Sequence, residues 1–166
     1  GTSWTGPPNG TGGTSGVDVQ EQINKLDALF IGNDPSSNIN FQLDEVVTHS
    51  VGYGVSIYQS DSSFKNTWPA IDPEEYFNIW IIPCMGGGPC GSWATFPTSH
   101  GNGDDGIVVA SHNLVGGGTQ DNYSDGHMGL AHEAGHYLGL YHIWGDGDCS
   151  QDDGIDDTPN QDGYVD

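Results

Sequence analysis

Residues 132–142 read HEAGHYLGLYH, and the spacing of their histidines is the strongest constraint that the chain carries. Residues i and i+4 of an α-helix lie on the same face, so His132 and His136 are placed to direct two imidazole nitrogens at one metal ion. Gly139 suits the left-handed conformation that ends a helix and turns the chain, which brings His142 back as a third ligand. The sequence therefore predicts a helix, a glycine turn and a site of three imidazoles.

The predicted chemistry depends on this ligand set and on Glu133. Three neutral imidazoles leave a tetrahedral Zn²⁺ ion with one open position for water, as in catalytic zinc sites. Glu133 lies beside the helical histidines, where it can act as the general base on zinc-bound water that attacks a polarised carbonyl. The alternative is a structural zinc site with Asp146 or Asp148 as its fourth ligand. The other histidines are expected to be structural or solvent-facing: His49, His100, His112 and His127.

The charge balance of the chain favours cations as partners. Asp and Glu number 23 against two basic residues, which gives a formal net charge of −21. Nucleic acids and anionic membranes require clustered Lys and Arg, so neither is expected as a partner. No apolar run approaches the length of a membrane span, and no leader opens the sequence, so any signal peptide is expected to have been removed or not included.

Hydrophobic periodicity predicts two helices. Residues 1–17 have the composition of a loop, and a helix is predicted from Asp18 to Gly32, with Asp18 and Glu21 forming a capping-box-like start. The zinc helix is predicted at about 125–138. One face of this helix is expected to pack against the core, with Ala131, Ala134 and Leu138. The other face is expected to point away from the core, with His132, Glu133 and His136.

Strands are predicted between the two helices. Alternation of apolar and polar residues predicts a half-buried strand at 39–47 and a weaker one at 51–59. Short apolar runs predict more fully buried strands at 77–82 and 106–110.

The three cysteines are an odd number. Cys84 and Cys90 flank a short MGGGP loop that a local disulfide can close, which leaves Cys149 without a partner.

The wider sequence around the histidines resembles a known family. HExxHxxGxxH is the zinc signature of the metzincin clan of metallopeptidases. The run HEAGHYLGLYHIWGDGDC, the following DDTPNQ and the upstream NIWIIP, GSWATFP and DGIVVAS look like the pappalysin family (peptidase M43, cytophagalysin-like). The similarity spans residues 18–160. It implies a secreted, extracellular zinc endopeptidase of the α/β (α+β) class, in which a twisted, mostly parallel sheet carries a backing helix and an active-site helix.

The resemblance also implies a structural calcium site, with one or more ions, after the third histidine. The matching positions are Asp153, the backbone carbonyl of Ile155, and Thr158, with Asp156 and Asp157 as further candidates. Independently, Ca²⁺ takes several oxygen ligands from flexible loops, and DDGIDDT offers carboxylates, a hydroxyl and carbonyls. A solvated acidic loop is the alternative.

Protein or peptide substrates are the partners that the resemblance implies. Pappalysins pair extended substrates with an exposed strand above the cleft, and residues 91–96 match that stretch. Trp93 can equally be an ordinary core aromatic. The expected substrate-binding residues are Gly91, Ser92, Trp93 and Ala94.

The resemblance implies one catalytic domain over residues 1–166, with a core at 18–142 and an acidic calcium-binding region at 143–166. The first strand of the family and its Met-turn, which follows the third histidine, have no counterpart here, and the family counterpart of Cys149 bonds to a cysteine further downstream. We therefore expect the chain to be part of a larger protein, with the remaining polypeptide or a larger extracellular assembly as partner.

A different class of function is the alternative to the enzyme. An extracellular calcium- and zinc-binding structural or adhesive module without peptidase activity would keep the zinc-binding helix and lack the lower half of the cleft. Glu133 favours the enzyme, because a structural zinc site does not need a carboxylate there. The missing C-terminal part favours the module.

Overall fold

The computed structural model describes residues 18–33, 36, 39–49, 63–82, 91–114, 128–145 and 150–161. Some predictions fall outside these residues and stay predictions: the loop at 1–17, the strand at 51–59, and the disulfide between Cys84 and Cys90 with Cys149 left over.

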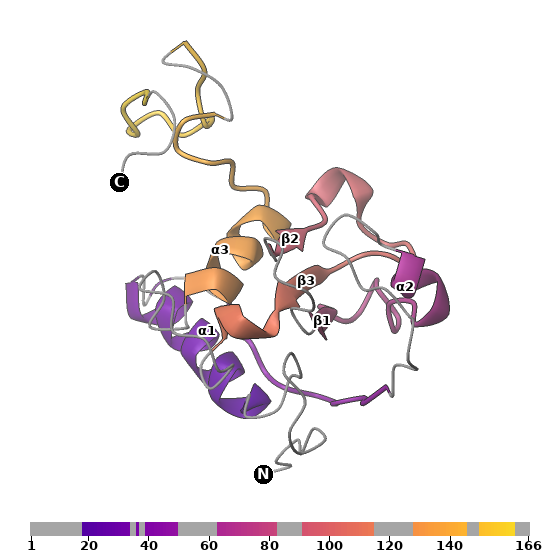
Figure 1. Cartoon of the computed structure of the whole chain (residues 1–166). Helices are drawn as coiled ribbons and strands as arrows, with labels where there is room; N and C mark the ends of the chain where they lie inside the picture. The colour runs from indigo at the N-terminus through magenta and orange to yellow at the C-terminus, as the bar shows by residue number, and fades with distance from the viewer. Residues whose placement is uncertain are drawn as a thin grey trace.

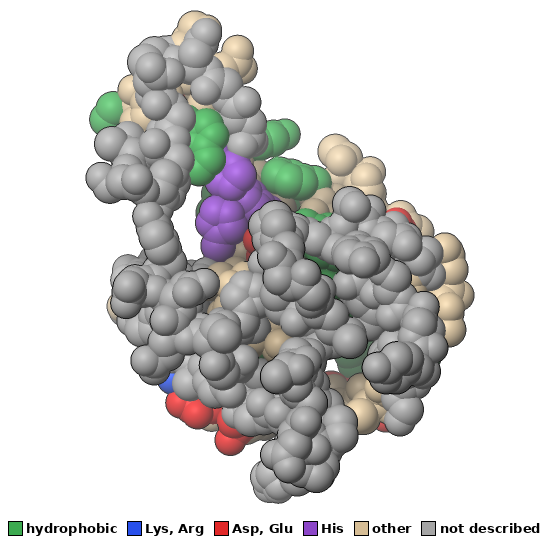
Figure 2. Space-filling view, viewed as in Figure 1, with side chains coloured by type: hydrophobic (Ala, Val, Ile, Leu, Met, Phe, Trp, Pro, Cys, Tyr) green, Lys and Arg blue, Asp and Glu red, His purple; other side chains and the backbone are tan. Residues whose placement is uncertain are grey.

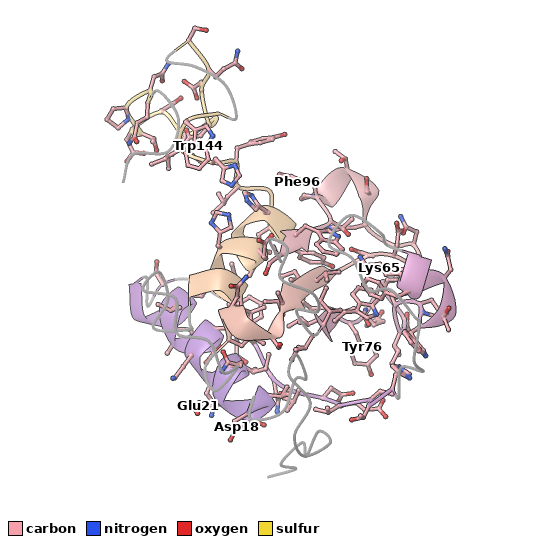
Figure 3. All side chains as sticks on the ribbon, in the orientation of Figure 1. Asp18, Glu21, Lys65, Tyr76, Phe96 and Trp144 are labelled. Atoms are coloured by element: carbon pink, nitrogen blue, oxygen red, sulfur yellow. The ribbon has the colours of Figure 1, made fainter. Side chains whose placement is uncertain are left out.

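The first helix, α1, spans Val19–Asn33, close to its predicted range. Its N-terminus is capped as expected, because the backbone N–H of Glu21 donates to Asp18 Oδ1 at 3.0 Å. Figure 3 labels both residues at the start of the helix. The Glu21 carboxylate pairs one turn on with Lys25 Nζ at 2.7 Å. Gly32 lies inside the helix, which ends one residue later than predicted.

A small mixed sheet forms the centre of the molecule. Its strands are β1 (Ile79–Ile82), β2 (Trp93–Ala94) and β3 (Ile107–Ala110), in the spatial order β1-β3-β2. β1 and β3 are parallel, whereas β2 and β3 are antiparallel. The strands predicted at 77–82 and 106–110 are confirmed, and β2 lies at an edge of the sheet within the described residues.

The central strand β3 is covered on both faces, which explains why its sequence is a continuous apolar run. Ile107 and Val109 pack with α1 and with α3 (Met128–Tyr137) through Leu26, Leu130 and Ala134. Val108 packs on the other face against Phe64 of the short helix α2 (Ser63–Thr67). Figure 1 shows α1 and α3 together on one side of the sheet and α2 on the other.

The segment 39–47 is not a strand, so the prediction from its alternation is wrong. The backbone N–H of Phe41 donates to Asp27 Oδ1 on α1 at 2.8 Å, instead of to a neighbouring strand. The Phe41 ring packs edge-on against Phe30, with ring centroids 5.1 Å apart. Alternation indicates only that one side of the segment is buried, and here that side packs against helix α1.

The zinc helix is shorter at its C-terminal end than predicted. α3 ends at Tyr137, and residues 125–127 lie outside the described residues. The core position expected for Leu138 is wrong, because the residue lies beyond the helix and is 44% exposed. Two 3₁₀ turns, η1 (Pro97–Ser99) and η2 (Ser111–Asn113), complete the elements. No helix in the described ranges has the length and apolar character needed to cross a membrane.

Candidate metal centre

Helix α3 presents two histidines on one face because its other face is buried. Leu130 and Ala134 are 3% and 0% exposed and pack against β3. His132 and His136 lie one turn apart on the helix, and His132 is exposed. Figure 2 shows histidine side chains gathered at the surface next to hydrophobic ones.

A Schellman motif ends α3 and turns the chain toward the third histidine. The N–H of Leu140 donates to the carbonyl of Gly135 at 2.9 Å, and the N–H of Gly139 donates to the carbonyl of His136 at 2.9 Å. Gly139 has a φ of 99°, which disfavours any side chain. A Cβ at this position would also lie 3.3 Å from Pro97 Cγ. The predicted role of this glycine agrees with the geometry.

The three imidazoles converge on one point. The distances between their Nε2 atoms are 3.1 Å for His132 and His136, 3.1 Å for His136 and His142, and 3.2 Å for His132 and His142. A tetrahedral zinc ion with nitrogen ligands at about 2.0–2.1 Å requires ligand atoms about 3.3–3.4 Å apart. The observed triangle is therefore of the size that such an ion needs.

Hydrogen bonding among the imidazoles does not account for this triangle. Each Nε2 carries either one hydrogen or one lone pair, so three mutual contacts cannot all be hydrogen bonds. His136 Nδ1 lies 2.7 Å from the carbonyl oxygen of Leu140, to which it can only donate. That bond leaves the Nε2 of a neutral His136 as a lone pair directed at the other two imidazoles. A lone pair directed at two neighbouring imidazole nitrogens fits a cation shared by the three rings.

The third ligand is held by an aromatic side chain. His142 stacks on Trp144, with ring centroids 4.3 Å apart and an angle of 7° between the ring planes. Figure 3 labels Trp144 above the end of α3. Because His142 lies outside the helix, this stack fixes a ring plane that helical geometry does not set.

Burial shifts the pKa of two neighbouring groups on α3. It raises the pKa of Glu133 to about 7, since the carboxyl group is removed from water. Glu133 is 6% exposed, so it is more buried than a position facing away from the core implies. Burial also lowers the pKa of His132, and His136 and His142 act in the same direction. A lowered pKa favours the neutral imidazole, which is the form that binds a metal.

The edge strand β2 lies next to this centre and contains Trp93 and Ala94, and the other predicted substrate-binding residues, Gly91 and Ser92, directly precede it. The Ser92 hydroxyl accepts hydrogen bonds from the Ala110 backbone N–H at 3.3 Å and from Asn113 Nδ2 at 3.2 Å. Trp93 packs against the cluster around Val108, as an ordinary core aromatic would. The structure thus gives Ser92 and Trp93 inward contacts, which anchor the strand at the sheet edge.

The acidic region after the third histidine forms a compact turn. Asp153 is 8% exposed, and its Oδ1 accepts a hydrogen bond from the Ile155 N–H at 2.9 Å. The Ile155 carbonyl accepts a hydrogen bond from the Thr158 N–H at 3.0 Å. In the described part of the chain, one group of three ligand atoms from His, Cys, Asp or Glu lies within 4.8 Å of one another, and it belongs to His132, His136 and His142. The carboxylates of Asp153, Asp156 and Asp157 therefore do not form such a group of three.

Sequence reasoning missed the groups that support the histidines. The Leu140 carbonyl and the Trp144 ring hold His136 and His142, and the Phe96 ring packs 5.4 Å from the His136 ring. Only Trp144 left a signal in the sequence, as an aromatic residue close behind the third histidine. Asp146 and Asp148, the alternative fourth ligands, lie outside the described residues.

Comparison with known proteins identifies the family. The peptidase M43 family model, described as pregnancy-associated plasma protein-A, matches residues 58–165, which include Glu133 and the three histidines. The chain belongs to this family. The predicted resemblance is confirmed, and the matched residues include the three imidazoles that could hold a metal ion.

Relatives of this M43 chain include extracellular metalloproteases of fungi. The one from Arthroderma gypseum is 32% identical over 129 residues, which cover 66% of this chain and 43% of the relative. The one from Arthroderma otae is 29% identical over 167 residues, covering 89% of this chain and 61% of the relative. The chain thus spans about half the length of the curated relatives that it matches.

The fold is shared with a solved M43 structure. Mature mirolysin from Tannerella forsythia, in complex with a cleaved peptide, superposes with a TM-score of 0.65 and 27% identity. The match covers 93% of this chain and 69% of mirolysin. The predicted α+β metzincin-like fold is confirmed.

Proposed function

We propose that the protein is a secreted zinc-dependent endopeptidase that hydrolyses peptide bonds in protein or peptide substrates. The observation that carries this proposal is the convergence of three imidazole Nε2 atoms at 3.1–3.2 Å, with the buried Glu133 directly after the first ligand. Similar proteins named extracellular metalloproteases support both the reaction and the location.

The chemistry divides between the metal and the side chains. His132, His136 and His142 would hold a Zn²⁺ ion, which would supply a Lewis acid that makes water more acidic and polarises the scissile carbonyl. Glu133 accepts a proton from the attacking water as general base, and it donates that proton to the leaving amine as the carbon–nitrogen bond breaks. The Leu140 carbonyl keeps His136 in the tautomer that presents Nε2.

The substrate pairs with the free edge of β2, the side that no other described strand occupies, over Gly91, Ser92, Trp93 and Ala94. The Thr95 N–H donates to the Gly106 carbonyl on the β3 side at 3.0 Å. Adjacent residues of a strand direct their backbone groups to opposite sides, so Ala94 offers its N–H and carbonyl to the free edge. An extended peptide can add there as a further strand.

A structural Ca²⁺ ion stabilises the acidic region through Asp153, the Ile155 carbonyl and Thr158, with Asp156 or Asp157 as further oxygen ligands. Asp153 is 8% exposed in a chain of formal net charge −21, so a bound cation would offset the repulsion that this carboxylate meets. Calcium should raise the melting temperature of the wild-type protein and have little effect on Asp153→Asn. Equal melting temperatures with and without calcium would refute the site.

Zinc content and peptide cleavage test the proposed function together. The protein should bind one zinc ion and cleave a mixed peptide library, and Glu133→Ala should keep zinc and lose about 10²- to 10⁴-fold in kcat. Glu74→Ala, an exposed carboxylate far along the chain from the centre, is the matched control and should cleave normally. Bound zinc without cleavage in the wild type would contradict the proposal and leave a calcium- and zinc-binding module.

A further inference from the structure

We propose that Phe96 and Tyr141 form one wall of a substrate subsite that selects an apolar side chain close to the scissile bond. We refer to these two residues as the aromatic pair. The inference rests on the proposed peptidase function and adds a substrate preference to it.

The aromatic pair lies against the metal centre, with Phe96 partly buried and Tyr141 open to solvent. Its ring centroids are 5.3 Å apart, with an angle of 28° between the ring planes. The Phe96 ring lies 5.4 Å from the ring of the metal ligand His136, and Tyr141 directly precedes the ligand His142. Tyr141 is 55% exposed, the highest value among the exposed large hydrophobic residues of the described chain. Figure 3 places Phe96 beside the end of α3.

The direction of the edge strand brings the aromatic pair to the substrate. Side chains alternate along a strand, so Phe96 lies on the same side as Ala94, which packs under α3. Phe96 continues the extended backbone, with φ −74° and ψ 157°. A peptide paired at Ala94 therefore places a side chain on the α3 side as a cross-strand neighbour of Phe96. Tyr141 then covers the same side chain from the segment after Gly139.

The segments that carry the pair are the ones that build the metal centre. Pro97, next to Phe96, packs against Gly139, where a Cβ would lie 3.3 Å from Pro97 Cγ. The pair is thus fixed relative to the zinc ligands, as a specificity wall requires.

The chemistry of the surroundings favours an apolar occupant over an acidic one. The two basic residues of the chain are engaged elsewhere. Lys25 pairs with Glu21 on α1, and the buried Lys65 donates to the Asp104 carbonyl at 2.6 Å. An acidic substrate side chain would meet two aromatic rings and no cation from this chain. A cationic side chain stacked on the rings is the competing outcome of the test.

The test uses peptides that differ at one residue, scanned over the positions on each side of the scissile bond, with Phe, Leu, Ser, Glu or Lys at that residue. At one position the wild type should prefer Phe and Leu over Ser by about tenfold in kcat/KM. Tyr141→Ala should lower this preference about three- to tenfold with zinc content unchanged, and Tyr141→Phe should restore it. Tyr76→Ala removes a tyrosine of similar exposure, 46%, distant from the centre, and is the control.

A second readout separates this inference from the proposed function. In the Glu133→Ala background, the dissociation constants of the same peptides should show the same order, Phe and Leu before Ser. Efficient cleavage with no preference for Phe or Leu, or with a preference for Lys, would overturn the inference and leave the peptidase intact. Zinc binding without cleavage of any peptide would overturn both.

Discussion

The metal centre joins two regions of different construction, the helical pair His132 and His136 and the loop ligand His142. The helical pair lies on an α-helix whose other face is buried against β3. His142 lies beyond the helix end, on a chain that has just turned at Gly139. All three Nε2 atoms nevertheless lie within 3.1–3.2 Å of one another.

The three Nε2 distances are nearly equal, but different structural features hold the helical pair and the loop ligand in place. The i, i+4 spacing brings the helical pair together once the helix forms. His142 needs the Schellman turn at Gly139 and the Trp144 stack as well. We therefore expect substitutions near the loop ligand to change zinc affinity by graded amounts, and loss of a helical ligand to have the largest effect.

Removal of a helical ligand should have the largest effect. Zinc binding to structural sites with four ligands has a free energy of about 10–16 kcal/mol, so the loss of one ligand should weaken binding strongly. His136→Ala should weaken zinc binding about 1000-fold, because the hydrogen bond to the Leu140 carbonyl is lost together with the ligand. His142→Ala should weaken it about 100-fold. Competition with a chelator of known zinc affinity measures both. If His142→Ala weakens zinc binding as much as His136→Ala or more, the helical pair does not contribute more to zinc affinity than the loop ligand.

Gly139→Ala should loosen the turn and leave the helix in place. Alanine at a φ of 99° costs about 1–2 kcal/mol, and its Cβ would press on Pro97. Zinc affinity should fall about tenfold while the helical circular dichroism signal remains. The control is Gly32→Ala on α1, where a Cβ meets nothing within 4 Å and should stabilise the protein by about 0.5–1 kcal/mol. Similar zinc affinities of the two variants would show that the turn is not required.

Trp144→Ala should have a smaller effect on the same ligand. Aromatic stacking contributes about 0.5–1.5 kcal/mol, so zinc should bind about two- to tenfold more weakly and dissociate faster. Trp144→Phe keeps an aromatic face against His142 and should recover most of the affinity. If Trp144→Ala releases zinc at the wild-type rate, the stack does not position the ligand.

Asp18→Ala should have the smallest effect on the centre. The carboxylate caps α1 through the Glu21 N–H, so its loss should lower the free energy of unfolding by about 1 kcal/mol. Zinc affinity should not change, because the hydrogen bond of this cap is local to the start of α1. Urea unfolding and zinc competition on one sample check both parts, and a drop in zinc affinity would show coupling between α1 and the centre.

The same contrast explains how much of the molecule could be predicted from the sequence. The helical ligands, the turn at Gly139, the Asp18 cap and the buried strands at 77–82 and 106–110 depend on local spacing or on apolar runs, and all are present. Residues close together in the sequence determine these features, and over such short ranges hydrophobic periodicity predicts structure.

The predictions that were wrong depended on distant contacts. The segment 39–47 alternates like a strand, yet Asp27 on α1 takes the N–H of Phe41. Leu138 fits the helical stripe but follows the end of α3 and is exposed. The burial of Glu133 and the stack of His142 on Trp144 likewise depend on which segments meet in the fold, and spacing does not encode that.

X-ray absorption spectroscopy at the zinc edge is the most direct test of a zinc centre with three histidine ligands. We expect one zinc ion with three imidazole nitrogens at about 2.0–2.1 Å and one oxygen from water. The protein should contain zinc in a one-to-one ratio, and His142→Ala should show one imidazole fewer. A spectrum with two imidazoles in the wild type, or with a carboxylate from Asp146 or Asp148 as fourth ligand, would contradict a catalytic centre of three histidines.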